Sequence, residues 1–160
     1  MKKNFIFSIF VFLGVFGLFA VNSFGVDVPN TLYDLSDTDT GNWLGTDRVY
    51  SVSALDDENV YIGAEDGKFG RYNKNTNIST DLSGTDTGNW LSTSAVRSVF
   101  ALDDENVYIG AGGGKFGRYN KTSNVLADLS GTDTGNWLST SAVFSFFALD
   151  DENVYIGAVG

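Results

Sequence analysis

The sequence places an aspartate, an asparagine and a tryptophan together three times, in the stretches DTGNW at 39–43, 86–90 and 133–137. A flat aromatic ring can stack on the face of a sugar, while amide and carboxylate groups bind its hydroxyls. The candidate ligand-binding residues are therefore Trp43, Trp90, Trp137, Asp39, Asp86, Asp133, Asn42, Asn89 and Asn136. The alternative is structural: each tryptophan fills the seam between repeated units, while Asp and Asn cap the turn.

The sequence offers few residues that could form a disulfide, a metal site or a catalytic site. The chain contains no cysteine and no histidine, which excludes disulfides, Cys/His metal sites and nucleophiles activated by histidine. The segment DTDTGN at 37–42 has the alternating carboxylates of a calcium loop, but both later copies read GTDTGN and lose one of them. We therefore expect no metal and no cofactor. We also expect no enzymatic activity, because near-identical copies give the same groups the same surroundings, whereas an acid and a base need different ones.

The candidate stretches belong to a longer repeat with a period of 47 residues. ALDDENVYIGA occurs at 54–64, 101–111 and 148–158, and KFGRYNK occurs at 68–74 and 115–121. Segments 84–111 and 131–158 differ at only two positions, where Arg97 and Val99 correspond to Phe144 and Phe146. A register this strict indicates duplication of a whole structural unit.

The sequence of one unit predicts four short strands. In the second complete copy they lie at 96–102, 107–111, 115–120 and 125–129. The run VYIGA at 107–111 is apolar throughout, which is typical of a strand buried on both faces. No sustained helical period is present, and β-branched residues and glycine are abundant. Four antiparallel strands in a repeat of about 40–50 residues are typical of a β-propeller blade. We therefore expect an all-β fold, a β-propeller built of 47-residue blades.

A family resemblance lies in the stretch NWLSTSAVRSVFALDDENVYIGAGGGKFGRYN at 89–120. It is similar to the propeller repeats in the sensor ectodomains of two-component regulators. The residues that match that frame are Val96, Ser98, Asp103, Asp104, Tyr108, Ile109, Gly110, Gly114, Arg118 and Tyr119. The resemblance covers most of 48–160 and implies a propeller. The sequence contains no kinase, receiver or DNA-binding segment, so a signalling role does not follow from it.

The first 25 residues have the composition of an export signal. Two lysines precede an apolar run from Phe5 to Val21, and small residues follow. This order predicts a secretory signal cleaved after Gly25, with an uncleaved N-terminal anchor as the alternative. We therefore expect residues 26–160 to form a repeat segment outside the cell or in the cell envelope.

The repeat segment predicts an incomplete ring. A lone outer strand at 28–35 precedes blades at 48–83 and 95–130 and a partial blade at 143–160, which makes about two and a half blades. A closed propeller has roughly four to eight blades. We expect either a fragment of a longer protein or, if the chain ends at 160, self-association of several copies.

The net charge of the chain limits the classes of molecule that it is expected to bind. The net charge of −10 argues against nucleic acid and against anionic membrane surfaces. We expect a secreted or cell-envelope module that binds a protein or carbohydrate ligand on a propeller face. The alternatives are the ectodomain of a membrane sensor whose signalling part is missing, and a carboxylate-based glycosidase or lyase. Fold alone does not choose among these functions.

Overall fold

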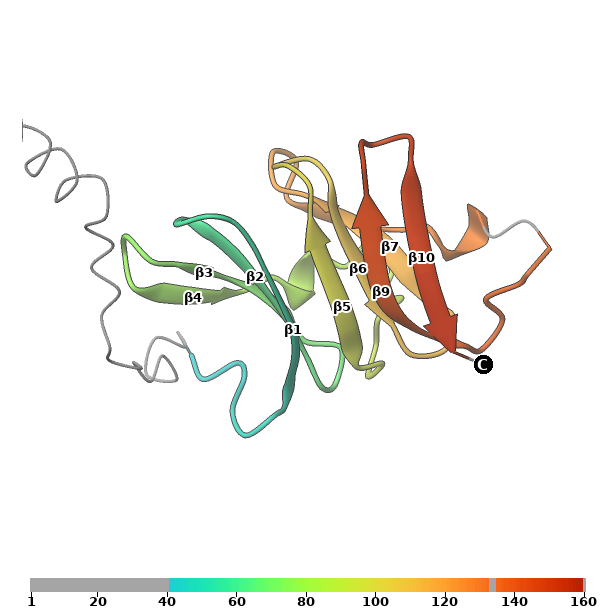
Figure 1. Ribbon diagram of the computed structural model, residues 1–160. Coiled ribbons are helices and arrows are strands. Elements are labelled where there is room, and N and C mark those ends of the chain that lie inside the picture. The colour runs from blue at the N-terminus through green and yellow to red at the C-terminus, as the bar shows by residue number, and fades with distance from the viewer. Residues whose placement is uncertain (1–40, 133–134, 160) are drawn as a thin grey trace, which may run out of the picture. The chain divides into compact units, whose positions relative to one another are not determined.

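A computed structural model describes residues 41–132 and 135–159, which all lie within one compact unit, 35–160 (Figure 1). The expected signal at 1–25, the expected lone strand at 28–35, and Asp39 and Asp133 lie outside the described residues. No helix in the described part has the length and apolar character needed to span a bilayer.

The strands of the described residues form three antiparallel sheets, which confirm the expected all-β class. Two short 3-10 helices, η2 (Ser83–Thr85) and η3 (Ser130–Thr132), follow the first and second sheets. The first sheet consists, in spatial order, of β1 (Val49–Asp56), β2 (Asn59–Ala64), β3 (Phe69–Asn73) and β4 (Ile78–Asp81). The second consists of β5 (Val96–Ala101), β6 (Val107–Ala111), β7 (Phe116–Asn120) and β8 (Val125–Asp128). The third is a hairpin of β9 (Ala142–Ala148) and β10 (Val154–Val159). These sheets do not close into a ring within the described residues, so the propeller stays a prediction.

The turns follow directly from the local sequence. In the acidic turn between β5 and β6, the Asp103 carboxylate accepts the backbone N–H groups of Glu105 and Asn106, each at 2.8 Å. The next turn needs glycine, because Gly114 has a φ of +70° and its α-carbon faces the Ser139 carbonyl so closely that a Cβ would collide with it. These turns return each strand beside the previous one, which produces the strand order within the sheet.

The first and second sheets pack face to face around an apolar core. Its buried members include Tyr61 and Phe69 from the first sheet and Tyr119 from the second. The Tyr119 ring lies edge-on to both partners, with its centroid 6.0 Å from that of Tyr61 and 5.5 Å from that of Phe69. Gly63 permits the close approach, because a Cβ there would lie 2.5 Å from Cγ1 of Val96. The absence of a side chain on β2 thus makes room for the next sheet.

The second sheet and the β9–β10 hairpin repeat this contact one period later. Tyr108 and Phe116 pack with Val143 and Phe146, and a Cβ on Gly110 would lie 2.5 Å from Cγ1 of Val143. All five residues of β6 are buried, since its side chains alternate between the two cores. The expectation that 107–111 is buried on both faces is therefore confirmed.

Burial in this stack depends on the neighbouring sheet and not on the local sequence. Three tyrosines occupy equivalent places in the three copies of VYIGA. Tyr61 and Tyr108 are 0% and 4% exposed because another sheet covers each of them, whereas Tyr155 on the terminal hairpin is 58% exposed. The outer face of the first sheet is also open, with Val49 and Val52 exposed.

Replacement of matched tyrosines tests how much the sheet-to-sheet contact contributes. Tyr119 and Tyr72 are equivalent, and their hydroxyls donate to Asn124 at 3.0 Å and to Asn77 at 3.1 Å. Only Tyr119 is buried between two sheets. Tyr119→Ala should lower the free energy of unfolding by about 3–4 kcal/mol, and Tyr72→Ala by no more than about half of that.

Urea unfolding followed by circular dichroism measures both losses. Equal losses for the two variants would mean that the contact between the sheets contributes little.

Candidate functional site

The DTGNW loop between β4 and β5 is held by its own aspartate. The Asp86 carboxylate accepts the backbone N–H of Trp90 at 3.1 Å and that of Leu91 at 2.8 Å. Asn89 has a left-handed backbone with a φ of +53°, and Asn42 and Asn136 have φ values of +56° and +52°. Asparagine tolerates this conformation better than most residues. The candidate Asp86 is thus engaged within the loop, and the asparagines occupy turn positions.

Two of the three candidate tryptophans pack against glycines of the third strand of a sheet. Trp43 is 8% exposed and lies against Gly70 of β3, while the half-buried Trp90 lies against Gly117 of β7. A Cβ on either glycine would collide with the indole ring. Trp90 also contacts the core between the first and second sheets. Trp90 therefore lies in a seam between sheets, as the structural alternative expects, whereas no sheet precedes Trp43 in the described part of the chain.

The third candidate, Trp137, has a different environment. It is 58% exposed, because no third strand pairs with β10 among the described residues. The corresponding glycine, which covers the ring in the other two copies, is therefore not present beside it. Trp137 instead borders a pocket.

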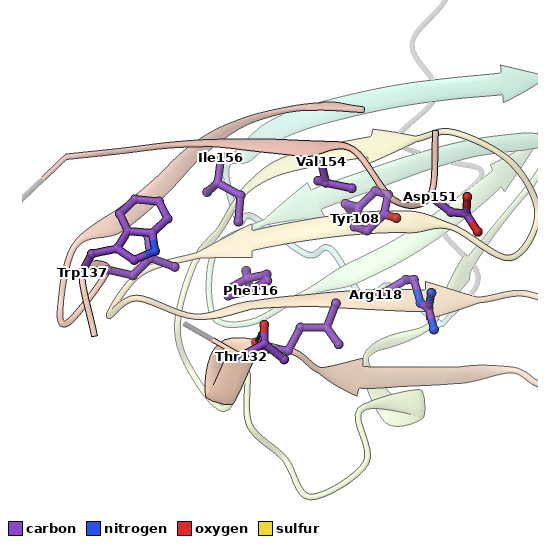
Figure 2. Close-up of a pocket in the computed structure, with 10 residues that line it drawn as sticks. Tyr108, Phe116, Arg118, Thr132, Trp137, Asp151, Val154 and Ile156 are labelled. Carbon is purple, nitrogen blue, oxygen red and sulfur yellow. Dashed lines mark hydrogen bonds between the residues drawn. The ribbon is translucent and has the colours of Figure 1, made fainter. Parts of the chain in front are cut away.

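This pocket of about 370 Å³ lies between the second sheet and the β9–β10 hairpin. Figure 2 shows Trp137 at one end and Arg118 and Asp151 at the other, with Phe116 on the floor and Ile156 on the β10 side. One end is thus aromatic and the other charged. Of the seven candidate residues that the structure describes, only Trp137 lines this pocket.

The wall of the pocket is a second copy of a buried interface. Its residues Tyr108, Phe116, Trp137, Val154 and Ile156 are each one 47-residue period after residues of the first seam. Those counterparts, in the same order, are Tyr61, Phe69, Trp90, Val107 and Ile109. In that seam, the side chains of Tyr119 on β7 and Leu126 on β8 are buried. The pocket therefore corresponds to the space that a third and a fourth strand fill in the preceding repeat.

The charged end of the pocket also differs from its counterparts. Asp57 and Asp104 form ion pairs with Lys74 and Lys121 at 3.2 Å and 3.1 Å. No such ion pair is found for the equivalent Asp151 within the described part of the chain, because both lysines follow a third strand. The sequence alignment of the repeats could have indicated this position, since the residues of the pocket wall match those of the first seam.

Arg118 and Tyr108 add polar groups to the pocket wall. Arg118 donates from Nη1 to Oδ1 of Asn106 at 3.2 Å. Burial raises the pKa of Tyr108 and outweighs the opposing effect of Arg118, so its hydroxyl is protonated at neutral pH. The wall therefore offers hydrogen-bond donors beside its apolar surface.

A row of side chains on the first strands of the three sheets departs from the repeat. Tyr50, Arg97 and Phe144 are equivalent positions, and the Arg97 guanidinium carbon lies 5.3 Å from the Tyr50 ring centroid and 5.2 Å from that of Phe144. This sandwich is a cation–π contact on both faces of the guanidinium. Sequence comparison identified the divergent positions but not their contact.

No known family model matches this chain, and no curated protein matches it. Weakly similar solved structures include two designed proteins. The computationally designed Ika8 protein is 22% identical, covering 69% of this chain and 30% of that one, with a TM-score of 0.48. The computationally designed Ika4 protein is 14% identical, covering 72% of this chain and 93% of that one, with a TM-score of 0.33. The chain thus spans less than a third of the length of the Ika8 protein.

The acidic turns should make stability depend on pH. Burial opposes ionisation of Asp103, but hydrogen bonds from Asn106 and from the Glu105 N–H outweigh it and lower the pKa of this carboxyl. A carboxyl with a lowered folded-state pKa stabilises the fold above its unfolded pKa and loses that contribution as the pH falls through the folded value. As the pH drops under about 4, the melting temperature should therefore decrease. In Asp103→Asn, this decrease should be smaller.

Thermal unfolding at several pH values between neutral and strongly acidic measures this effect. Glu105→Gln is the matched control, because the turn uses the backbone N–H of Glu105 and not its carboxylate. An unchanged pH profile in Asp103→Asn would contradict the account.

Proposed function

We propose that this chain is a secreted or cell-envelope β-propeller repeat module that binds protein. The stacking of four-stranded antiparallel sheets at a 47-residue period supports the propeller arrangement, because each sheet buries its faces against its neighbours. The two N-terminal lysines and the apolar run that follows them support export.

The observation that carries the protein-binding function is the pocket beside Trp137. Its wall is built of the same residue types that enclose Tyr119 and Leu126 in the preceding seam. An open strand edge on β10 lies beside this pocket, since β10 pairs with β9 alone among the residues that the structure describes. Backbone hydrogen bonds along such an edge supply affinity for an added strand, and side-chain pockets supply its specificity.

The ligand that fits best is a β-hairpin like β7–β8 itself. Its first strand needs glycine where it meets Trp137, as Gly117 meets Trp90. Two positions later it needs an aromatic residue for the pocket, as Tyr119 fills the first seam, and its second strand needs an apolar residue equivalent to Leu126.

A glycan is the second candidate, and it rests on the exposed Trp137 with Arg118 and Asp151 in the same pocket. An aromatic ring with charged hydrogen-bonding groups nearby suits a sugar. A protein ligand is favoured because the equivalent rings of Trp43 and Trp90 pack against the backbone of glycines. The sensor ectodomain and the carboxylate-based glycosidase or lyase remain alternatives without a supporting contact.

Titration of the full-length chain with a synthetic peptide tests the proposal. The peptide has the sequence of residues 114–129, GKFGRYNKTSNVLADL. It should bind with a blue shift of tryptophan emission that is absent in Trp137→Phe, because the peptide removes water from the Trp137 ring. The peptide carrying Gly117→Val should bind at least about tenfold more weakly.

Oligosaccharides such as cellohexaose and chitohexaose form the second arm of the titration. If the peptide has no effect while an oligosaccharide shifts the emission of Trp137, the pocket is a glycan site and the protein-binding function is wrong.

A further inference from the structure

The two ends of the stack expose different apolar faces. The leading face, on the first sheet, carries Val49, Val52, Val60 and Ile62. The trailing face, on the β9–β10 hairpin, carries Ser145, Phe147, Tyr155 and Gly157. Val49, Val52, Phe147 and Tyr155 are among the exposed large apolar side chains of the described residues.

Faces of these two kinds already meet twice inside the chain. Gly63 of β2 lies against Val96 and Val99 of β5, and Gly110 of β6 lies against Val143 and Phe146 of β9. By the 47-residue period, Gly157 is the next glycine in this series, while Val49 and Val52 are the counterparts of Val96 and Val99. The leading and trailing faces are therefore the two halves of one repeated contact.

Two hydrogen bonds also join the first sheet to the second. The Ser51 hydroxyl accepts the backbone N–H of Val99 at 2.8 Å, and the Ser53 hydroxyl accepts that of Ala101 at 2.9 Å. Ser145 is the counterpart of Ser51 and is exposed on the trailing face. Val52 is the counterpart of Val99, so its N–H is the matching donor on the leading face.

We propose that the trailing face of one copy of this chain binds the leading face of a second copy. Val49 and Val52 of the second copy pack over Gly157 and Tyr155, and the Ser145 hydroxyl accepts the N–H of Val52 of the second copy. The contact is heterologous, because two different surfaces meet, so it continues from copy to copy until a ring closes. This inference rests on the proposed propeller arrangement, but it uses surfaces separate from the Trp137 pocket.

Complementary variants of the full-length chain test the head-to-tail contact. Val52→Asp places a charge on the leading face, and Tyr155→Asp places one on the trailing face. Both side chains are exposed, so each variant should keep the circular dichroism spectrum of the parent chain. Gly157→Val adds bulk to the trailing face without a charge, and its Cβ would also collide with the Ser145 hydroxyl that the proposed contact uses.

Analytical ultracentrifugation should find that the parent chain forms oligomers larger than dimers. Each single-face variant alone should lose them. A mixture of Val52→Asp and Tyr155→Asp should form a dimer of one copy of each, since each retains one intact face. Ile78→Asp is the matched control and should assemble like the parent, because Ile78 is exposed on β4 and its counterpart Val125 belongs to neither apolar core.

Three outcomes would overturn the inference. A monomeric parent chain would show that the faces do not bind a second copy. Symmetric dimers that survive in one of the variants but not in the mixture would show that like faces meet. Assembly unchanged in all variants would place it elsewhere, for example in the apolar N-terminal run, which every variant shares. None of these outcomes depends on peptide binding at Trp137, so the two proposals fail separately.

Discussion

The structure depends on one contact, in which a glycine on the second strand of a sheet admits a β-branched or aromatic side chain from the first strand of the next. Gly63 admits Val96, and Gly110 admits Val143. Any side chain at these glycines would push the sheets apart and expose the tyrosines packed beside them. A single sheet has two faces to bury, so the chain gains stability only as a stack.

The candidate site follows from the same contact. Where a complete sheet follows its tryptophan, as with Trp43 and Trp90, the ring is packed against a glycine of the third strand. Where only a hairpin follows, as with Trp137, the ring is exposed and a pocket remains beside it. The environment of each tryptophan is therefore set by the strands that accompany it, and not by the DTGNW sequence itself.

Much of this arrangement could be predicted from the sequence. The repeat gave the strand positions, and the apolar run at 107–111 indicated burial on both faces, because a strand between two cores needs no polar side. The different environments of Tyr61 and Tyr155 could not be read locally, since both lie in the same VYIGA sequence. The pocket beside Trp137 was likewise missed, because a cavity depends on how neighbouring strands pack around the ring in the folded chain. The stacking of Arg97 between Tyr50 and Phe144 needed the register of three separate strands.

The most direct test of this account completes the third repeat within the chain. Gly160 corresponds to Gly113, so the sequence GKFGRYNKTSNVLADL appended after it continues the period in register. The account predicts that the added hairpin covers Trp137, which would shift its fluorescence emission to the blue and raise the melting temperature. Emission from Trp137 that stays at the wavelength of the shorter chain would contradict the claim that its pocket is a place for a β-hairpin of the repeat.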